Sequence, residues 1–186
     1  MTQEETELLE IEEEKKEKLA ALLLLFMSKK TNLYAILLGL PLLNKELERF
    51  LVSSRKGASE LAARHTDGKA RGTALARKAL IVAAVQRLTG ALVGHAAVSG
   101  ETIPKESIVD AVITSNGNRI ITTEVFEAYN NTILKDLKEG EKVQWISALE
   151  KNTCGECESY HGNIYTAETC PEIPVHNHCK CYLEKV

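Results

Sequence analysis

The sequence is poor in aromatic residues, in proline and in long apolar runs. Phe, Trp and Tyr together make up 5% of its 186 residues, and four prolines are present. A core for this chain must therefore be built mainly from Leu, Ala, Val and Ile. The apolar run LAALLLLFM, residues 19–27, covers nine positions, whereas a helix needs about 20 residues to cross a bilayer. This run therefore predicts no membrane span, and no membrane partner is expected.

The sequence also lacks an export signal and a disulfide framework. Residues 1–18 hold eight Glu and three Lys, whereas an export signal begins with basic residues and continues with an apolar segment. The cysteine count of five is odd, which argues against a framework of paired cysteines. We therefore expect the chain to be made and folded in a reducing cytoplasm.

Neither sign of charge is in large excess, because the formal net charge is -3. The uneven part is the basic segment 55–87, which carries eight Lys or Arg residues against Glu60 and Asp67. This segment could contact DNA phosphates. The simpler interpretation is a solvated helix face, because alanines intersperse the basic residues and no aromatic residue accompanies them. No nucleic-acid-binding residue can be assigned from this pattern.

The first part of the chain predicts helices. Thr2 and Glu5 fit a capping box, which predicts a helix from there to about Lys30. The first half of this helix is charged and the second half is apolar nearly all round, so we expect only the second half to pack into the core. Gly39 and Pro41 then predict that a helix ends or kinks near them.

Beyond this break, Asn44 can cap a further helix. Residues 54–72 contain three glycines and predict a loop or a short helix. Later helices are bounded by turn signals and are expected over 73–98, 104–115 and 119–139. The pair Asn116-Gly117 predicts the stop between the last two. Together these elements form an expected helical body, residues 1–140.

The character of the sequence changes after Gly140. Three short strands are expected there, over residues 142–149, 163–166 and 180–186. The first alternates polar and apolar residues, which places Val143 and Trp145 on the inward face. The expected fold class is therefore mainly α with a small C-terminal β-hairpin zinc-binding module (α+β), residues 141–186.

All five cysteines of the chain lie between residues 154 and 181. Two pairs of soft ligands, each with two intervening residues, are separated by 18 residues, a spacing typical of tetrahedral zinc sites. The candidate metal ligands are Cys154, Cys157, His176, Cys179 and Cys181. Either Cys179 or Cys181 can complete the shell, because they would face the same way on a strand. His161 and His178 are weaker candidates, and Cys170 is expected to take no part.

A metal ion is also expected on energetic grounds. Residues 142–186 number 45. So short a segment buries too little surface to be stable by itself, and it needs a metal ion, a disulfide or packing against the helical body. Structural zinc supplies roughly 10–16 kcal/mol of binding energy at neutral pH. The expected cofactor is therefore Zn²⁺ in a structural role.

Other interpretations of the cluster fit less well. A redox CxxC opens a helix inside a βαβ unit, whereas the residues after Cys157 predict a turn and a strand. A zinc deaminase requires His-x-Glu and Pro-Cys-x-x-Cys motifs, and neither occurs. A catalytic zinc keeps one coordination position open, whereas five candidates can close the shell here. We therefore expect no catalytic residues and no enzymatic activity.

From Trp145 onward the sequence resembles the C-terminal domain of the phage Mu F-type head morphogenesis family, which are minor capsid proteins of tailed phages. The family pattern is a Trp-bearing strand, Thr-Cys-x-x-Cys, a Gly-containing turn with an aromatic residue, and Pro-x-His-x-x-Cys-Arg-Cys. The matching positions are Trp145, Thr153, Cys154, Cys157, Gly162, Tyr165, Pro174, His176, Cys179 and Cys181. The preceding helix also resembles the Thr-Glu helix of the family, at Thr123, Glu124 and Asn130.

The resemblance covers about residues 118–186 and implies a role in virion assembly. It departs from the family pattern at Thr122, Glu150, His161 and Lys180. On this hypothesis the chain is made in the host cytoplasm and lies inside the virion head as a structural protein. Its expected partners are the portal or the major capsid protein, with packaged DNA as a further candidate, and the zinc module acts as a scaffold.

Two other functions are weighed against this one. A zinc-dependent nucleic-acid-binding regulator would need base-reading side chains on an exposed helix next to the ligand pairs, and none is evident. A CxxC redox protein is the less favoured alternative, for the reasons given above.

Overall fold

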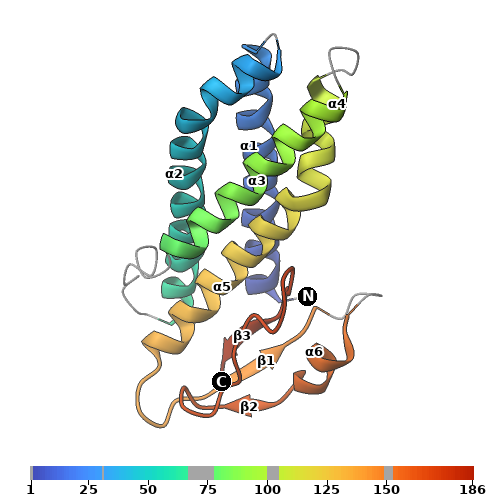
Figure 1. The fold of residues 1–186 in the computed structure, drawn as a ribbon. Coiled ribbons are helices and arrows are strands. Elements are labelled where there is room, and N and C mark those ends of the chain that lie inside the picture. The colour runs from blue at the N-terminus through green and yellow to red at the C-terminus, as the bar shows by residue number, and fades with distance from the viewer. Residues whose placement is uncertain (1, 31, 67–77, 100–104, 149–152) are drawn as a thin grey trace.

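The computed structural model describes residues 2–30, 32–66, 78–99, 105–148 and 153–186. Helices pack into an elongated body, and a small antiparallel sheet lies at one end of it (Figure 1). The elements are α1 (Gln3–Ser28), α2 (Leu33–His65), α3 (Lys78–Ser99), α4 (Lys105–Val112), the π-helix η2 (Ile113–Gly117), α5 (Asn118–Asp136), β1 (Val143–Ile146), α6 (Gly155–Tyr160), β2 (Ile164–Tyr165) and β3 (Tyr182–Lys185). The expected fold class, mainly α with a small C-terminal β module, is confirmed.

Helix α1 begins where the capping box predicts. Thr2 Oγ1 accepts a hydrogen bond from the Glu5 backbone N–H at 3.1 Å, which satisfies one of the free donors of the first turn. The charged half of α1 nevertheless packs on the body, contrary to expectation. Glu12 is 1% exposed, lies 2.7 Å from Lys16 Nζ, and accepts a hydrogen bond from the Thr122 hydroxyl of α5 at 2.5 Å.

Helix α2 continues through Gly39 and Pro41, so the predicted end of a helix there is wrong. Pro41 is exposed, and α2 continues past it although the proline cannot donate a backbone hydrogen bond. The cap is Asn32 rather than Asn44, since Asn32 Oδ1 accepts from the Ala35 N–H at 2.9 Å. One apolar face runs past the proline and holds the helix on the core through Ile36, Leu43, Leu47, Leu51, Ala58, Leu61 and Ala62.

The loop or short helix expected over 54–72 is also wrong in its first part. Residues 54–65 belong to α2, and residues 67–72 lie outside the described part of the chain. Ser54, Ala58 and Leu61 all face the core. Their packing outweighs the low helix propensity of the neighbouring Gly57.

Helix α3 confirms the helix expected over 73–98 from residue 78 onward, while residues 73–77 lie outside the described part. Residues Ala79–Ser99 are long and apolar enough, by length and composition, to cross a membrane. No unbroken apolar run marks this helix in the sequence, because Gln86 and Arg87 interrupt it. One face of α3 is buried, and the helix packs against α2 and α4 as a core helix does.

The expected stop at Asn116-Gly117 is wrong, because η2 carries the chain from α4 into α5 without a turn. Gly117 is buried there for a different reason. A Cβ at this position would lie 3.2 Å from Leu19 Cδ2 and 3.0 Å from Ile113 Cδ1. The glycine therefore permits close approach of α1 rather than a chain reversal.

Strand β1 lies at the centre of the sheet, between β2 and β3, and pairs antiparallel with both. Val143 and Trp145 are both 0% exposed, which confirms the predicted inward face. Trp145 pairs with Leu183 of β3. Its ring packs against Tyr160 and Tyr165, with ring centroids 4.9 Å and 6.4 Å apart, and so forms the aromatic core of the sheet.

The sheet packs on the helical body. A single cluster of buried apolar residues extends from α1 to β3, and α5 contacts β3 directly. Gly140 has a positive φ of 85° in the exposed turn between α5 and β1, at the boundary proposed between residues 1–140 and 141–186. The C-terminal part therefore shares its core with the helices, in addition to any support that a metal ion gives it.

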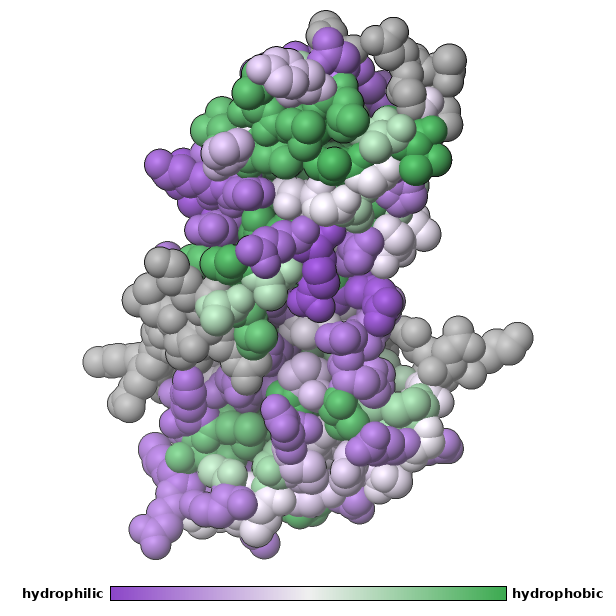
Figure 2. Space-filling view, viewed as in Figure 1, coloured by the Kyte–Doolittle hydropathy of each residue, from purple (hydrophilic) through white to green (hydrophobic). Residues whose placement is uncertain are grey.

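Apolar side chains gather on the surface at the end of the molecule where α1 gives way to α2 (Figure 2). Exposed residues from this region are Leu25, Leu33, Tyr34, Leu37, Leu38 and Leu42. Among them, Tyr34, Leu38 and Leu42 are each at least 67% exposed. Contiguous apolar surface of this kind is typical of a contact site for another molecule.

Candidate metal centre

The first ligand pair lies at the start of α6. Cys154 has an extended backbone and caps the helix, because its Sγ accepts a hydrogen bond from the Cys157 N–H at 3.4 Å. The chain is thus helical from Gly155 to Tyr160, which was not expected, and the expected turn and strand follow at residues 161–162 and at β2. A helix that begins at the CxxC motif is compatible with a redox centre, so the residues after Cys157 do not exclude one. The topology still weighs against one, since the described strands form an antiparallel sheet without a βαβ unit.

The second ligand pair lies on the segment that leads into β3. His176 Nδ1 lies 2.9 Å from the backbone carbonyl of Asn177, and a carbonyl can only accept. Nδ1 therefore carries the proton, and Nε2 presents its lone pair to the cysteines. A histidine oriented through its other ring nitrogen in this way is a usual feature of metal sites.

Three of the ligand–ligand distances are close to those found around one small ion. His176 Nε2 is 3.3 Å from Cys154 Sγ and 3.2 Å from Cys157 Sγ, and Cys157 Sγ is 3.7 Å from Cys179 Sγ. Tetrahedral zinc with ordinary bond lengths separates its ligands by about 3.6–3.8 Å. The donor set, thiols with one imidazole, also fits a borderline-soft ion. The cluster could therefore bind a metal ion.

Two overlapping triads make up the cluster. One consists of Cys154, Cys157 and His176, and the other of Cys157, Cys179 and Cys181; within each, the ligand atoms lie within 4.8 Å of one another. All five candidate ligands are thus brought together, and Cys157 belongs to both triads. Cys181 Sγ also lies 3.5 Å from the hydroxyl of Ser147.

The thiols differ in how readily they ionise. The pKa of Cys179 is lowered to about 5, chiefly because the neighbouring Cys181 thiol donates a hydrogen bond to its sulfur. The pKa of Cys181 is raised by the same contact, and burial raises the pKa of Cys157 to about 12. The Cys157 N–H lowers the pKa of Cys154. Several thiolates can form together here only with a cation among them, as metal binding provides.

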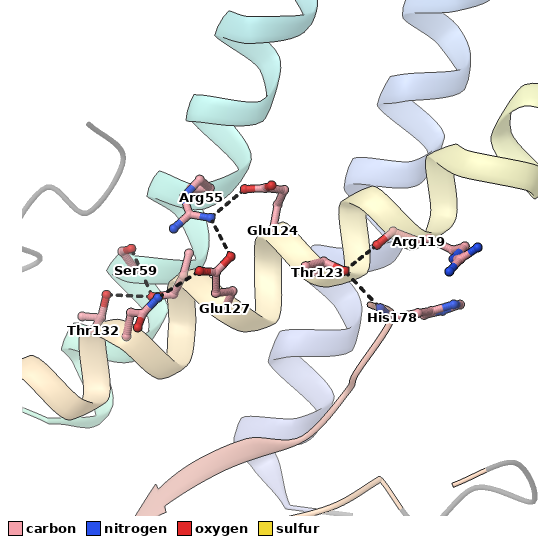
Figure 3. Close-up of polar contacts among 10 residues, drawn as sticks. Arg55, Ser59, Arg119, Thr123, Glu124, Glu127, Thr132 and His178 are labelled. Carbon is pink, nitrogen blue, oxygen red and sulfur yellow. Dashed lines mark hydrogen bonds and ion pairs between the residues drawn. The ribbon is translucent and has the colours of Figure 1, made fainter. Parts of the chain in front are cut away.

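The weaker candidates lie outside both triads. His161 Nδ1 accepts a hydrogen bond from the Ser147 backbone N–H at 3.1 Å, so this ring connects the turn after α6 to the end of β1. His178 has a positive φ of 67°, and its ring lies near Arg119 rather than among the cysteines (Figure 3). Cys170 is half-buried, and burial raises its pKa to about 11. The expectation that Cys170 takes no part is consistent with its exclusion from the triads.

Helix α5 fixes the centre to the helical body. Thr123 Oγ1 accepts a hydrogen bond from the His178 N–H at 3.0 Å and donates one to the Arg119 carbonyl at 2.8 Å (Figure 3). Asn130, which is 0% exposed, bonds to the backbone of Cys181 and Leu183. Sequence reasoning gave neither contact. For the Asn130 contact, the available signal in the sequence was a polar residue near the apolar Phe126 and Ile133, in a segment that predicts a helix.

Ser147 is a supporting residue that sequence reasoning missed. Its hydroxyl donates a hydrogen bond to the Cys157 carbonyl at 2.5 Å, and its side chain is buried between β1 and α6. A lone serine at the end of a strand carries no signal of such a role. A hollow of about 320 Å³ opens beside the cluster and is lined by Cys154, Cys157, His176 and Cys181 together with Thr153, Lys180 and their neighbours.

The basic segment 55–87 is not one exposed face. Arg55 is 1% exposed and is paired with Glu124 at 2.6 Å and Glu127 at 3.4 Å (Figure 3). It is therefore unavailable to DNA, and the solvated-face interpretation is wrong for it as well. His65, in the same segment, is partly buried and lies 3.1 Å from Glu4. Residues 67–77 of the segment lie outside the described part.

Comparisons of the chain with protein-family models, with curated proteins and with solved structures found no match. The interpretation of the centre therefore depends on its own geometry and on the sequence pattern.

Proposed function

We propose that the centre binds one structural Zn²⁺ through Cys154, Cys157, His176 and Cys179. These four side chains are connected by the three short ligand–ligand distances given above. Cys181 would stay beside the ion as a thiol near Ser147. Four protein ligands close a tetrahedral shell and leave no position for a substrate, which supports a structural rather than a catalytic role.

We further propose that the chain is a minor head protein of a tailed phage, a structural protein of head morphogenesis without enzymatic activity. One observation supports this proposal: the two sequence motifs that resemble the head morphogenesis family lie in contact in the structure. The Thr-Glu helix and the cysteine/histidine motif, 55 residues apart, meet through the bond between His178 N–H and Thr123 Oγ1. In this role the ion fixes a rigid knob at one end of a helical body.

The apolar patch at the α1–α2 end supports a docking role for the body. In a head protein, its partners would be the portal or the major capsid protein, on the inner side of the head. The patch and the metal centre are at opposite ends of the elongated molecule (Figure 1), so docking at the first would leave the second accessible. Packaged DNA is a further candidate partner in that location.

Sedimentation tests the assembly role. The chain is expected to sediment with assembled heads in a lysate and to remain with them after purification. Replacing Leu38 and Leu42 with Glu should release it into the soluble fraction, whereas Leu80→Glu on α3 should not. A wild-type chain that never sediments with heads would contradict the proposal, whatever its metal content.

A further inference from the structure

A second hollow lies next to the segment before β3 that carries His176 and Cys179, here called the metal loop, on the side of the helical body. It encloses about 130 Å³ and is lined by residues of α3, η2, α5 and the loop before β3. The polar side chains in its lining are Arg87, Asn116, Arg119, Thr123, Glu124 and Asn177. Segments far apart in sequence therefore bring two guanidinium-bearing residues to one concave site.

The two arginines are not neutralised by the protein. Arg87 and Arg119 are exposed, and within the described ranges neither has a carboxylate partner. The carboxylate in the lining, Glu124, is engaged by the buried Arg55 at 2.6 Å. The hollow thus presents two guanidinium groups without a direct carboxylate partner, beside a carboxylate that is itself bonded to Arg55.

The metal loop holds one wall of this hollow in place. Asn177 lies between His176, a proposed ligand, and His178, whose N–H is bonded to Thr123 at 3.0 Å. Its carbonyl accepts from His176 Nδ1, so the backbone of Asn177 is fixed from both sides. The wall is therefore preorganised, which lowers the entropy lost when a ligand binds.

We propose that this hollow binds a phosphate group, with Arg87 and Arg119 as its two cationic contacts. Planar guanidinium groups bind phosphate oxygens in pairs of parallel hydrogen bonds, and two of them from different helices suit a single dianion or one phosphodiester. The group can come from a nucleic-acid backbone or from a free phosphate compound. The site follows from its own residues and does not require the role in head assembly.

The test uses the full-length, zinc-loaded chain and two probes. Inorganic phosphate is titrated by calorimetry, and a 20-base-pair DNA duplex of mixed sequence (about two helical turns) is titrated by fluorescence anisotropy at several salt concentrations. Arg87→Gln and Arg119→Gln should each weaken binding about tenfold or more. Each should also reduce the slope of log K against log salt for the duplex by about one.

Arg49→Gln is the matched control, because Arg49 is exposed on α2 and its loss changes the net charge equally. Arg87→Lys and Arg119→Lys keep the charge but remove the paired hydrogen bonds, and they provide folded variants if a glutamine variant does not fold. Arginine-dependent binding of phosphate alone assigns the site to free phosphate compounds, and arginine-dependent binding of the duplex assigns it to nucleic acid. Binding of neither probe, or binding that these variants weaken no more than Arg49→Gln, would overturn the proposal.

Discussion

Asn130 of α5 donates a hydrogen bond from Nδ2 to the backbone carbonyl of Cys181 at 2.9 Å. Its Oδ1 accepts from the Leu183 N–H at the same distance. One buried carboxamide therefore satisfies the Cys181 carbonyl and the Leu183 N–H, at the start of β3. This contact ties the end of the metal loop to the helical body without using a metal ligand.

Replacing Asn130 with Ala should lower the free energy of unfolding by about 2–4 kcal/mol, because it leaves a buried N–H and a buried carbonyl without partners. Urea denaturation of the zinc-loaded chain measures this loss. The neighbouring Asn131 is the control, since its side chain donates a hydrogen bond to Glu127 at 3.3 Å on a half-buried surface. Asn131→Ala should lower the stability by less than about 1 kcal/mol. Equal effects of the two changes would contradict the anchoring role.

Arg55→Met should destabilise the protein by about 3–5 kcal/mol, because Glu124 and Glu127 would keep buried negative charges without the guanidinium group that contacts both of them. Adding Glu124→Gln and Glu127→Gln to this variant should restore part of the loss, since uncharged amides are less costly to bury. Arg49→Met, at an exposed pair with Glu46, should change the stability by less than about 1 kcal/mol. Thermal or urea unfolding distinguishes these cases, and a triple variant no more stable than the single one would count against the electrostatic explanation.

Removal of the metal ion should unfold the sheet before the helices. We expect one zinc per chain by elemental analysis, and a strong chelator should shift Trp145 fluorescence to the red while most helical circular dichroism remains. Among the single Cys→Ser variants, Cys157→Ser should lower the zinc affinity most, because Cys157 belongs to both triads.

Cys179→Ser should also lose the ion, whereas Cys181→Ser and the control Cys170→Ser should retain one zinc per chain. If Cys181→Ser loses zinc and Cys179→Ser keeps it, the assignment of the fourth ligand is reversed. A protein that is folded around Trp145 with no metal bound would argue against the structural ion altogether.

Two helical glycines should respond in opposite directions to added side chains. Gly90 lies on the exposed side of α3 with no atom within 4 Å of the position that a Cβ would take, so Gly90→Ala should stabilise the protein by about 0.5–1 kcal/mol. Gly117→Val should destabilise it by about 1–3 kcal/mol, because its side chain would press on Leu19 and Ile113. The melting temperature should rise above the wild-type value for Gly90→Ala and fall below it for Gly117→Val. A stabilised Gly117→Val variant would refute the explanation that Gly117 permits close approach of α1.

The sequence carried enough information to predict the helical class, the cap at Thr2, the inward Trp145 and the set of cysteine and histidine residues that cluster as a candidate metal site. These features depend on local spacing: a capping pattern, an alternation of period two, and ligand pairs separated by two residues. Each is specified by a few neighbouring positions. The interactions that produce these features therefore involve residues close together in the sequence, so they can be predicted from it.

Several of the errors share one physical origin, because they arose where tertiary packing overrides a local signal. Pro41 and Gly57 indicate breaks, but the apolar face of α2 keeps the helix on the core through both. Gly117 indicates a stop, but it is small in order to admit Leu19. Arg55 resembles a surface cation, since nothing in its own neighbourhood indicates that two glutamates about 70 residues later will surround it.

The position of β3 also sets an order of events during synthesis. On the ribosome, all the helices of the body and the central strand β1 emerge before residues 179–185 are made. Until then the nascent chain holds Trp145 and Asn130 without the strand that covers them, and it lacks the thiols of Cys179 and Cys181. With the proposed zinc ligands, ion capture and closure of the sheet would both be late steps, because both need residues from Cys179 onward. A ribosome stalled shortly before them would present a helical bundle whose Trp145 is not yet covered by β3.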